Sequence, residues 1–240
     1  MPVQFPSRLT VMTYNIAQAV GQDNVESLPR IAQVIRASKA DVVALQEVAY
    51  DLFAGDQGVR LARMLGMHVA VGYKLGVWHT GPGHPDRPYG LVILSRHPIT
   101  AVRHRVLPAS RSDQRELLQA DIEMDGRTIT VATTHPTATS PERRAAQLAA
   151  VHAAVSELRQ PLVLVGDFND TPDKDTIRPF AAAFTDACAT WREPTFPSEK
   201  PVDRIDYIFA GRGFRVRSAG AVDTQASDHR PVVAQLALPG

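Results

Sequence analysis

Asp167 and Asn169 are the residues whose types and spacing point most directly to chemistry. They follow an apolar run, residues 162–165, that predicts a buried strand ending at Gly166. In an extended segment, side chains two residues apart lie on the same face. A carboxylate and a carboxamide at the end of a buried strand can hold a hard cation or a phosphate ester. A polar turn uses the same residue types, so these two residues alone do not decide between a site and a turn.

Further polar residues lie at or near the ends of other apolar runs. They are Asn15, Gln46, Glu47, His135, Asp206, Asp228 and His229. Burying a polar group costs free energy unless it finds a partner, and a solvated strand end explains any one of these residues taken alone. Their repeated placement predicts that they meet at one rim of the fold.

The elements that must position these residues follow from the hydrophobic periodicity. Strands are predicted at 8–16, 41–48, 67–73, 89–96, 99–107, 116–124, 127–134, 162–166, 205–210, 214–222 and 231–238. Helices are predicted at 25–37, 57–66, 140–158 and 176–183. Ser140 and Pro141 have the residue types of a helix N-cap and first turn, and Asp125-Gly126 predicts a hairpin. Segments 74–88 and 185–200 are predicted to be irregular, and residues 1–240 form a single domain without repeats or a linker.

Composition restricts the class of protein. A hydrophobic fraction of 44% supports a large core, and a net charge of +1 gives no strong field toward DNA or anionic membranes. The single cysteine, Cys188, excludes an internal disulfide. No apolar run is long enough to span a membrane, and the polar, proline-rich start does not resemble a signal peptide. A cytoplasmic protein is expected; a secreted form with a trimmed signal is the alternative.

Seven short motifs occur in one order along residues 8–238. They are TYNI, LQEV, YGLVILSRHPI, TTHP, GDFND, DRIDYIF and SDHRPV. With this ordered set the chain resembles the endonuclease/exonuclease/phosphatase superfamily, which has the DNase I-like fold. The resemblance implies an α/β four-layer sandwich in which two packed, mainly antiparallel β-sheets are flanked by helices.

The resemblance also implies a metal site. Glu47 is then the main ligand of Mg²⁺ or Mn²⁺, with Asn15 beside it and Asp228 completing that side. Mg²⁺ accepts few protein ligands and keeps several waters, which fits a carboxylate and a carboxamide. The ion would neutralise phosphate charge and stabilise the leaving oxygen.

The remaining motif residues receive roles in water activation. His229 is expected to act as the general base or, once protonated, to contact phosphate, and Asp206 to fix the imidazole tautomer. The alternative for Asp206 is an ion pair with Arg204. Asp167 and Asn169 are expected to position the water and the phosphoryl oxygens, and whether Asp167 or His229 is the base stays open.

Two further residues receive roles at the phosphate. His135 is expected to donate a hydrogen bond to it, and Arg115 is a weaker candidate for substrate binding. The motif around His135 departs from that of apurinic-site endonucleases, which carry a tyrosine there. DNase I pairs its corresponding histidine with a glutamate; Tyr89 stands at that place here, so His135 is expected to lack a carboxylate partner.

The main functional hypothesis is a divalent-metal-dependent phosphoesterase that cleaves phosphodiester or phosphomonoester bonds. Its substrate is a nucleic acid, a lipid head group or a small phosphodiester, and no obligate protein partner is expected. Sphingomyelinase-like or phosphoinositide- and sugar-phosphate-like activity is the alternative to a nuclease. A non-catalytic binding module, or DNA binding without hydrolysis, are the other hypotheses. The last would use the basic stretch of Arg103, His104, Arg105, Arg111 and Arg115.

Overall fold

Two β-sheets form the centre of the molecule in the computed structural model, which describes residues 8–51, 55–72, 76–78, 87–109, 114–158 and 161–238. The first sheet has the order β13 (Arg215–Ala221), β14 (Val232–Ala237), β1 (Arg8–Asn15), β2 (Val42–Asp51), β6 (Arg87–Ser95) and β4 (His68–Val71). Two short strands extend it, β3 (Gly55–Asp56) on β2 and β5 (Gly76–Trp78) on β6. The second sheet has the order β11 (Thr185–Asp186), β12 (Asp206–Ala210), β10 (Leu162–Asp167), β9 (Arg127–Thr134), β8 (Glu116–Met124) and β7 (Ile99–Val106).

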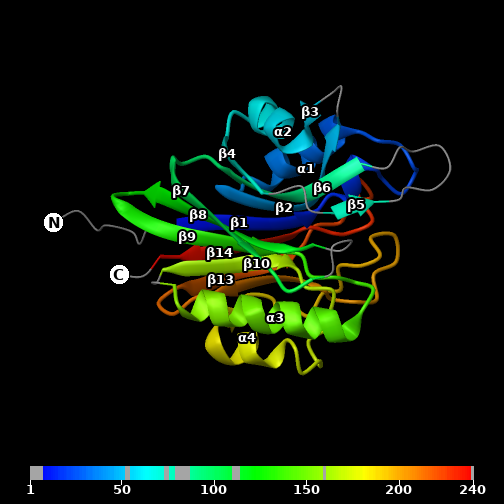
Figure 1. Ribbon diagram of the computed structural model, residues 1–240. Coiled ribbons are helices and arrows are strands. Elements are labelled where there is room, and N and C mark those ends of the chain that lie inside the picture. The colour runs from blue at the N-terminus through cyan, green and yellow to red at the C-terminus, as the bar shows by residue number, and fades with distance from the viewer. Residues whose placement is uncertain are drawn as a thin grey trace.

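Helices cover the outer face of each sheet (Figure 1). Helices α1 (Leu28–Ser38) and α2 (Gln57–Leu65) lie on the first sheet, and α3 (Pro141–Ser156) and α4 (Arg178–Ala183) lie below the second. The predicted four-layer α/β sandwich is confirmed. Both sheets are mainly antiparallel, with parallel pairs only between β1 and β2 and between β9 and β10 among the named strands. Among the described residues, no helix is long and apolar enough to cross a membrane.

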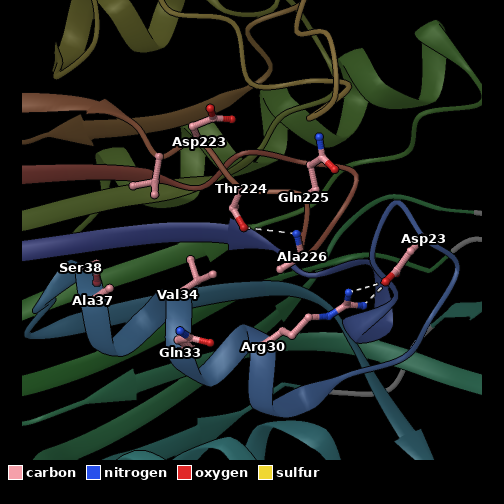
Figure 2. A pocket seen from close by; sticks show the side chains of 11 residues that line it. Asp23, Arg30, Gln33, Val34, Ala37, Ser38, Asp223, Thr224, Gln225 and Ala226 are labelled. Atoms are coloured by element: carbon pink, nitrogen blue, oxygen red, sulfur yellow. Dashed lines mark hydrogen bonds and ion pairs between the residues drawn. The ribbon is translucent and has the colours of Figure 1, made fainter.

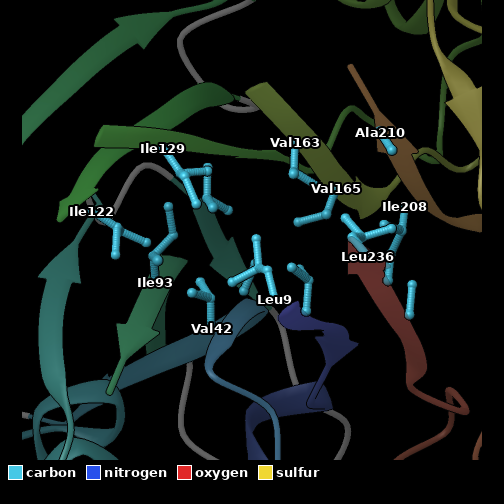
Figure 3. Packing of buried hydrophobic residues seen from close by; sticks show 14 of the residues in the cluster. Leu9, Val42, Ile93, Ile122, Ile129, Val163, Val165, Ile208, Ala210 and Leu236 are labelled. Carbon is cyan, nitrogen blue, oxygen red and sulfur yellow. The ribbon is translucent and has the colours of Figure 1, made fainter. Parts of the chain in front are cut away.

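Three hydrophobic cores separate the layers. The central core fills the space between the sheets, where Leu9, Val42 and Ile93 of the first sheet face Val163 and Ile208 of the second (Figure 3). The other two cores lie between each sheet and its helices. Strand alternation produces this division, because successive side chains of a strand point to opposite faces. Burial of the apolar area in three layers fixes the register of the strands that carry the polar residues.

Several local predictions are confirmed. Ser140 caps α3 by accepting a hydrogen bond from the Arg143 backbone N–H at 3.3 Å, and Pro141 lies in the first turn. The hairpin at 125–126 joins β8 to β9, with Met124 paired to Arg127. Helix α1 begins at Leu28 rather than at 25, because Ser27 takes an extended conformation before it.

The predictions of irregular structure were wrong in two places. The segment 74–88 contains β5 and the start of β6, although residues 73–75 and 79–86 lie outside the described part. The glycines and prolines of this segment give no strand pattern in the sequence, yet Gly76 of β5 pairs with Tyr89 of β6 at an edge of the first sheet. The segment 185–200 begins with β11, a two-residue strand whose register comes from β12 rather than from a local pattern.

Candidate active site

Asn15 joins the two sheets at their shared rim. Its side-chain nitrogen donates to Glu47 Oε1 and to Asp167 Oδ2, each at 3.0 Å, and lies 3.5 Å from Nε2 of His229. Its Oδ1 accepts from the Ala17 backbone N–H at 3.1 Å, which fixes the orientation of the carboxamide. Glu47 belongs to the first sheet and Asp167 to the second. One buried amide therefore holds carboxylates from both sheets.

Glu47 points to the rim because β2 leaves its regular course there. The register of β2 against β6 shifts between Leu45 and Val48, and Glu47 has a φ of 53°. Such a bulge re-aims a side chain, and positive φ at a non-glycine residue stores strain that is common at functional sites. Burial raises the pKa of the Glu47 carboxyl and the charge of Asp228 adds to this, while the hydrogen bond from Asn15 opposes it.

Asp167 and Asn169 are positioned by a tight contact at the end of β10. Gly166 has a φ of 149°, and a Cβ at this position would lie 2.1 Å from the carbonyl oxygen of Thr134. Asn169 also has positive φ, at 53°, and its backbone N–H donates to Asp167 Oδ1 at 2.9 Å. Its side-chain nitrogen donates to the Pro136 carbonyl at 3.0 Å. The Asp167 side chain is therefore anchored to the backbone of Asn169, and the Asn169 side chain to the segment that follows β9.

His229 and Asp206 form a buried pair beside Asp167. Asp206 opens β12 directly opposite Asp167, and its Oδ2 lies 3.0 Å from Nδ1 of His229. The other ring nitrogen, Nε2, lies 3.6 Å from Asp167 Oδ2. The alternative partner for Asp206 is ruled out, because Arg204 instead forms a two-pronged ion pair with Asp186. The arrangement is the one expected of an imidazole oriented by a carboxylate.

The charges of this group shift the pKa values of its members. Burial raises the pKa of Asp167 to about 7, with Asp206 adding to the rise and His229 opposing it. Burial alone would lower the pKa of His229, but the carboxylates of Asp206 and Asp167 outweigh it and raise the pKa to about 10. The carboxylates thus favour the protonated form of His229, while burial opposes ionisation of Asp167.

His135 approaches the same carboxylates from the second sheet. Its Nε2 lies 3.6 Å from Asp167 Oδ2 and 3.9 Å from Glu47 Oε1. Its Nδ1 faces Arg115, whose Nη1 lies 3.4 Å away, so this nitrogen has a guanidinium rather than a carboxylate beside it. Burial lowers the pKa of His135 well below its usual value, and the positive charges of Arg115 and His229 lower it further.

The model of the endonuclease/exonuclease/phosphatase family matches residues 12–229. The chain belongs to this family. Family members are typically phosphoesterase hydrolases, generally dependent on divalent metals. They act on phosphate esters, including nucleic acids.

Similar proteins cover nearly the whole chain. The uncharacterised protein YbhP of Escherichia coli K12 is 28% identical over 254 residues, covering 95% of this chain and 96% of its own. The crystal structure of an endonuclease/exonuclease/phosphatase from Beutenbergia cavernae is 33% identical, covers 97% of this chain and 72% of that one, and has a TM-score of 0.78. A mannosyl-6-phosphatase of Bacteroides thetaiotaomicron is 19% identical, covers 95% of this chain and 99% of that one, and has a TM-score of 0.77.

The donor set of this family member fits a divalent cation. Asn15 bonds both Glu47 and Asp167, Asp206 lies opposite Asp167 across the strand pair, and the charge of Asp228 raises the pKa of Glu47. Among the described residues, ligand atoms of Asp167, Asp206 and His229 lie within 4.8 Å of one another, close enough for these three side chains to hold an ion together. Buried carboxylates with raised pKa values lack full charge compensation, and a hard cation bound by oxygen ligands would supply it.

Several residues that support the site carried no role in the sequence analysis. Gln46 donates to Thr13 and to Thr133, at 3.1 and 3.0 Å, and so bonds the two sheets directly behind the rim. Ser227 donates to the Asn15 carbonyl at 2.7 Å and accepts from the His229 backbone N–H at 3.3 Å. Its place next to Asp228-His229 was the available signal. Gln46 was among the polar residues expected at the rim, but its partners Thr13 and Thr133 depend on the packing of the sheets.

Carboxylates lie beside the basic residues of the predicted stretch that belong to β7. Arg103 forms a two-pronged ion pair with Asp121 at 2.6 Å, Arg105 lies 3.4 Å from Glu157, and His104 lies 3.2 Å from Glu116. Arg111 lies outside the described residues. Of the described members, Arg115 alone is placed beside a site residue, namely His135. The predicted stretch therefore does not form a continuous free cationic surface on the described part of β7.

A groove of about 590 Å³ lies beside residues 222–226, in the segment that precedes Asp228. It runs between α1 and residues 222–226, where Arg30, Gln33 and Val34 face Thr224 and Gln225 (Figure 2). The Arg30 guanidinium is already held by Asp23 at 2.6 and 3.0 Å. None of the predicted site residues lines this groove, so it is separate from the active-site rim.

Proposed function

We propose that this family member is a divalent-metal-dependent phosphoesterase that hydrolyses phosphate esters by attack of an activated water. The observation that carries the proposal is the Asn15 carboxamide, which bonds Glu47 and Asp167 at 3.0 Å beside the buried Asp206–His229 pair. A stability role does not explain this arrangement, because buried carboxylates at one point destabilise a fold that lacks a cation there.

Glu47, with Asn15 and Asp228, is the set proposed to hold Mg²⁺ or Mn²⁺. A bound ion of this kind would neutralise phosphate charge and stabilise the leaving oxygen as a Lewis acid. The bulge at Glu47 and the bond from Asn15 hold the carboxylate in place before an ion arrives. This preorganisation matters because Mg²⁺ tolerates little distortion of its octahedral shell.

Asp167 is proposed to accept the proton of the attacking water. Its carboxylate is fixed by Asn15 at Oδ2 and by the Asn169 backbone N–H at Oδ1, and its pKa of about 7 matches the role of a base at neutral pH. His229, kept protonated by Asp206 and Asp167, is proposed to contact a phosphoryl oxygen. His135 donates a second hydrogen bond to the phosphoryl group, where charge develops during the reaction.

A small phosphate ester, such as a sugar phosphate or a lipid head group, is the proposed substrate class. A nuclease gains affinity by neutralising several backbone phosphates with free lysine and arginine side chains. On β7, Arg103 and Arg105 are engaged by Asp121 and Glu157. The fold likeness to a mannosyl-6-phosphatase supplies the first compound class to try.

The test is hydrolysis by the purified protein. We expect cleavage of bis-p-nitrophenyl phosphate or p-nitrophenyl phosphate with Mg²⁺ or Mn²⁺, and loss of activity with EDTA. Glu47→Gln and His229→Ala should each abolish it, while Asp121→Asn, a carboxylate change far along β8, should not. A panel of sugar phosphates, phosphoinositides, sphingomyelin, DNA and RNA then identifies the substrate class. Activity that survives EDTA and both site substitutions would falsify the proposal.

A further inference from the structure

Arg115 contacts Nδ1 of His135, whereas Nε2 is the ring nitrogen nearest to Asp167 and Glu47. Its Nη1 lies 3.4 Å from Nδ1 of His135 and 3.4 Å from the backbone oxygen of the same residue. The guanidinium lies over the ring of Tyr89, with its central carbon 5.7 Å from the ring centroid. Tyr89 is buried, and its ring therefore provides a fixed support for the cation. Arg115 is thereby directed at the side of His135 that faces away from the carboxylates.

The chemistry of the two groups determines where the imidazole hydrogen lies. A guanidinium has only donors, so a ring nitrogen that it contacts must be the acceptor. Nδ1 of His135 is then unprotonated, and in a neutral ring the hydrogen lies on Nε2. Nε2 in turn faces two acceptors, Asp167 Oδ2 at 3.6 Å and Glu47 Oε1 at 3.9 Å. The groups on both sides of the ring thus favour the same tautomer.

We propose that Arg115 is a positioning residue that fixes His135 in the tautomer with its hydrogen on Nε2, so that this histidine serves the reaction only as a hydrogen-bond donor. A carboxylate behind the ring would have the opposite effect, because it would accept from Nδ1–H and leave Nε2 as an acceptor. Replacing the carboxylate by a guanidinium therefore converts the site-facing nitrogen of a neutral imidazole from acceptor to donor. The kinetic consequence rests on the proposed function; the tautomer itself does not.

The direct test is nitrogen NMR of the protein labelled with ¹⁵N-histidine. The His135 signals are identified by their absence in His135→Gln. We expect Nδ1 at the shift of an unprotonated nitrogen and Nε2 at that of a protonated one. In Arg115→Met this preference should weaken, moving both shifts toward the values averaged between the tautomers, whereas Arg103→Met, an arginine change on β7, should leave them unchanged. A hydrogen on Nδ1 in the unaltered protein overturns the proposal, whether or not the protein hydrolyses any phosphate ester.

Kinetics then separate positioning from substrate binding. If Arg115 acts through His135, Arg115→Met should lower kcat about tenfold with little change in KM, since a donor is weakened at the developing charge. The same change should have almost no effect in a His135→Gln background, because coupled residues are not additive. A rise in KM alone, or an equal loss of activity in both backgrounds, would show that Arg115 contacts the substrate directly and would overturn the positioning role.

Discussion

Asp206 Oδ2 and His229 Nδ1 lie 3.0 Å apart, although Asp206 belongs to the second sheet and His229 to the segment that leads into the first. Asp206 opens β12 of the second sheet, and His229 precedes β14 of the first. The pair can form only when the sheets are packed in their final register. The orientation of the His229 imidazole therefore depends on correct packing of the two sheets.

The carboxylate of Asp206 is expected to control both the orientation and the charge of His229. In Asp206→Asn the shape is kept, but the negative charge that raises the pKa of His229 is lost. We expect kcat to fall by about a thousandfold or more, by analogy with the loss of an orienting carboxylate in a catalytic triad. Steady-state hydrolysis of p-nitrophenyl phosphate measures this effect. Asp121→Asn is the matched control, and a loss smaller than tenfold in Asp206→Asn contradicts the assigned role.

The pH dependence of the reaction distinguishes the two candidate bases. If Asp167 is the base and His229 the cationic contact, activity requires Asp167 ionised and His229 protonated. Since the pKa of Asp167 is about 7 and that of His229 about 10, kcat/KM should rise with pH up to about 7 and fall again toward 10. A bound cation stabilises the deprotonated forms, so it moves both limbs to lower pH.

The competing assignment gives a different curve. If neutral His229 were the base, activity would require it to lose its proton, and kcat/KM would keep rising up to its own pKa. Initial rates from pH 5 to 10.5 at saturating metal therefore decide the question. In Asp167→Asn the acid limb should disappear together with most of the activity; an acid limb that persists there excludes Asp167 as its source.

Gly166 is expected to be the most demanding glycine near the site. Its φ of 149° and the 2.1 Å approach of a Cβ to the Thr134 carbonyl mean that alanine fits only if β9 and β10 separate. We expect Gly166→Ala to lower the free energy of unfolding by about 3 kcal/mol or more. Gly126→Ala is the control, because its φ of 73° is strained but no atom lies within 4 Å of the added Cβ. Its expected cost is about 1–2 kcal/mol.

Urea unfolding of the two alanine variants measures the difference. Gly166→Ala should also reduce activity beyond its effect on stability, since Asp167 and Asn169 follow directly. Equal destabilisation of the two variants would mean that backbone strain, and not contact with Thr134, determines the cost.

The sequence predicted the strand ends well because the determinants there are local. The apolar runs before Asn15 and Asp167, and the polar residues that follow them, can be recognised without tertiary contacts. The ordered motifs supplied what periodicity could not, namely that the two sheets face each other. The remaining contacts of the site depend on tertiary packing. The sheet-bridging bonds of Gln46 and the pairing of Arg204 with Asp186 join residues whose chain separation hides them from any local pattern.

Short strands were missed for the same reason. β5 has a length of 3 residues and β11 of 2, too few for an alternating pattern to appear. Both lie at the end of a pairing with a longer strand, and that strand supplies their hydrogen-bond partners. The strand at β7 was located correctly, but the sequence did not reveal that its arginines have carboxylate partners within the protein. Asp121 and Glu157, the partners of its arginines, lie 18 and 52 residues further along the chain.

The ion pairs on β7 lead to a last prediction, on nucleic acids. Arg103 is held by Asp121 in a two-pronged pair, and Arg105 lies against Glu157. An arginine that must give up an intramolecular partner gains little by contacting a phosphate. We expect the double change Arg103→Ala with Arg105→Ala to alter DNA affinity less than twofold. The slope of log affinity against log salt should also stay shallow, near the value for one or two phosphate contacts, about −1 to −2.

Fluorescence anisotropy with a labelled duplex and Ca²⁺ in place of Mg²⁺ measures both quantities. A slope steeper than about −4 whose magnitude decreases by about 2 in the double variant would instead establish β7 as a nucleic-acid surface and favour nuclease activity over hydrolysis of a small phosphate ester.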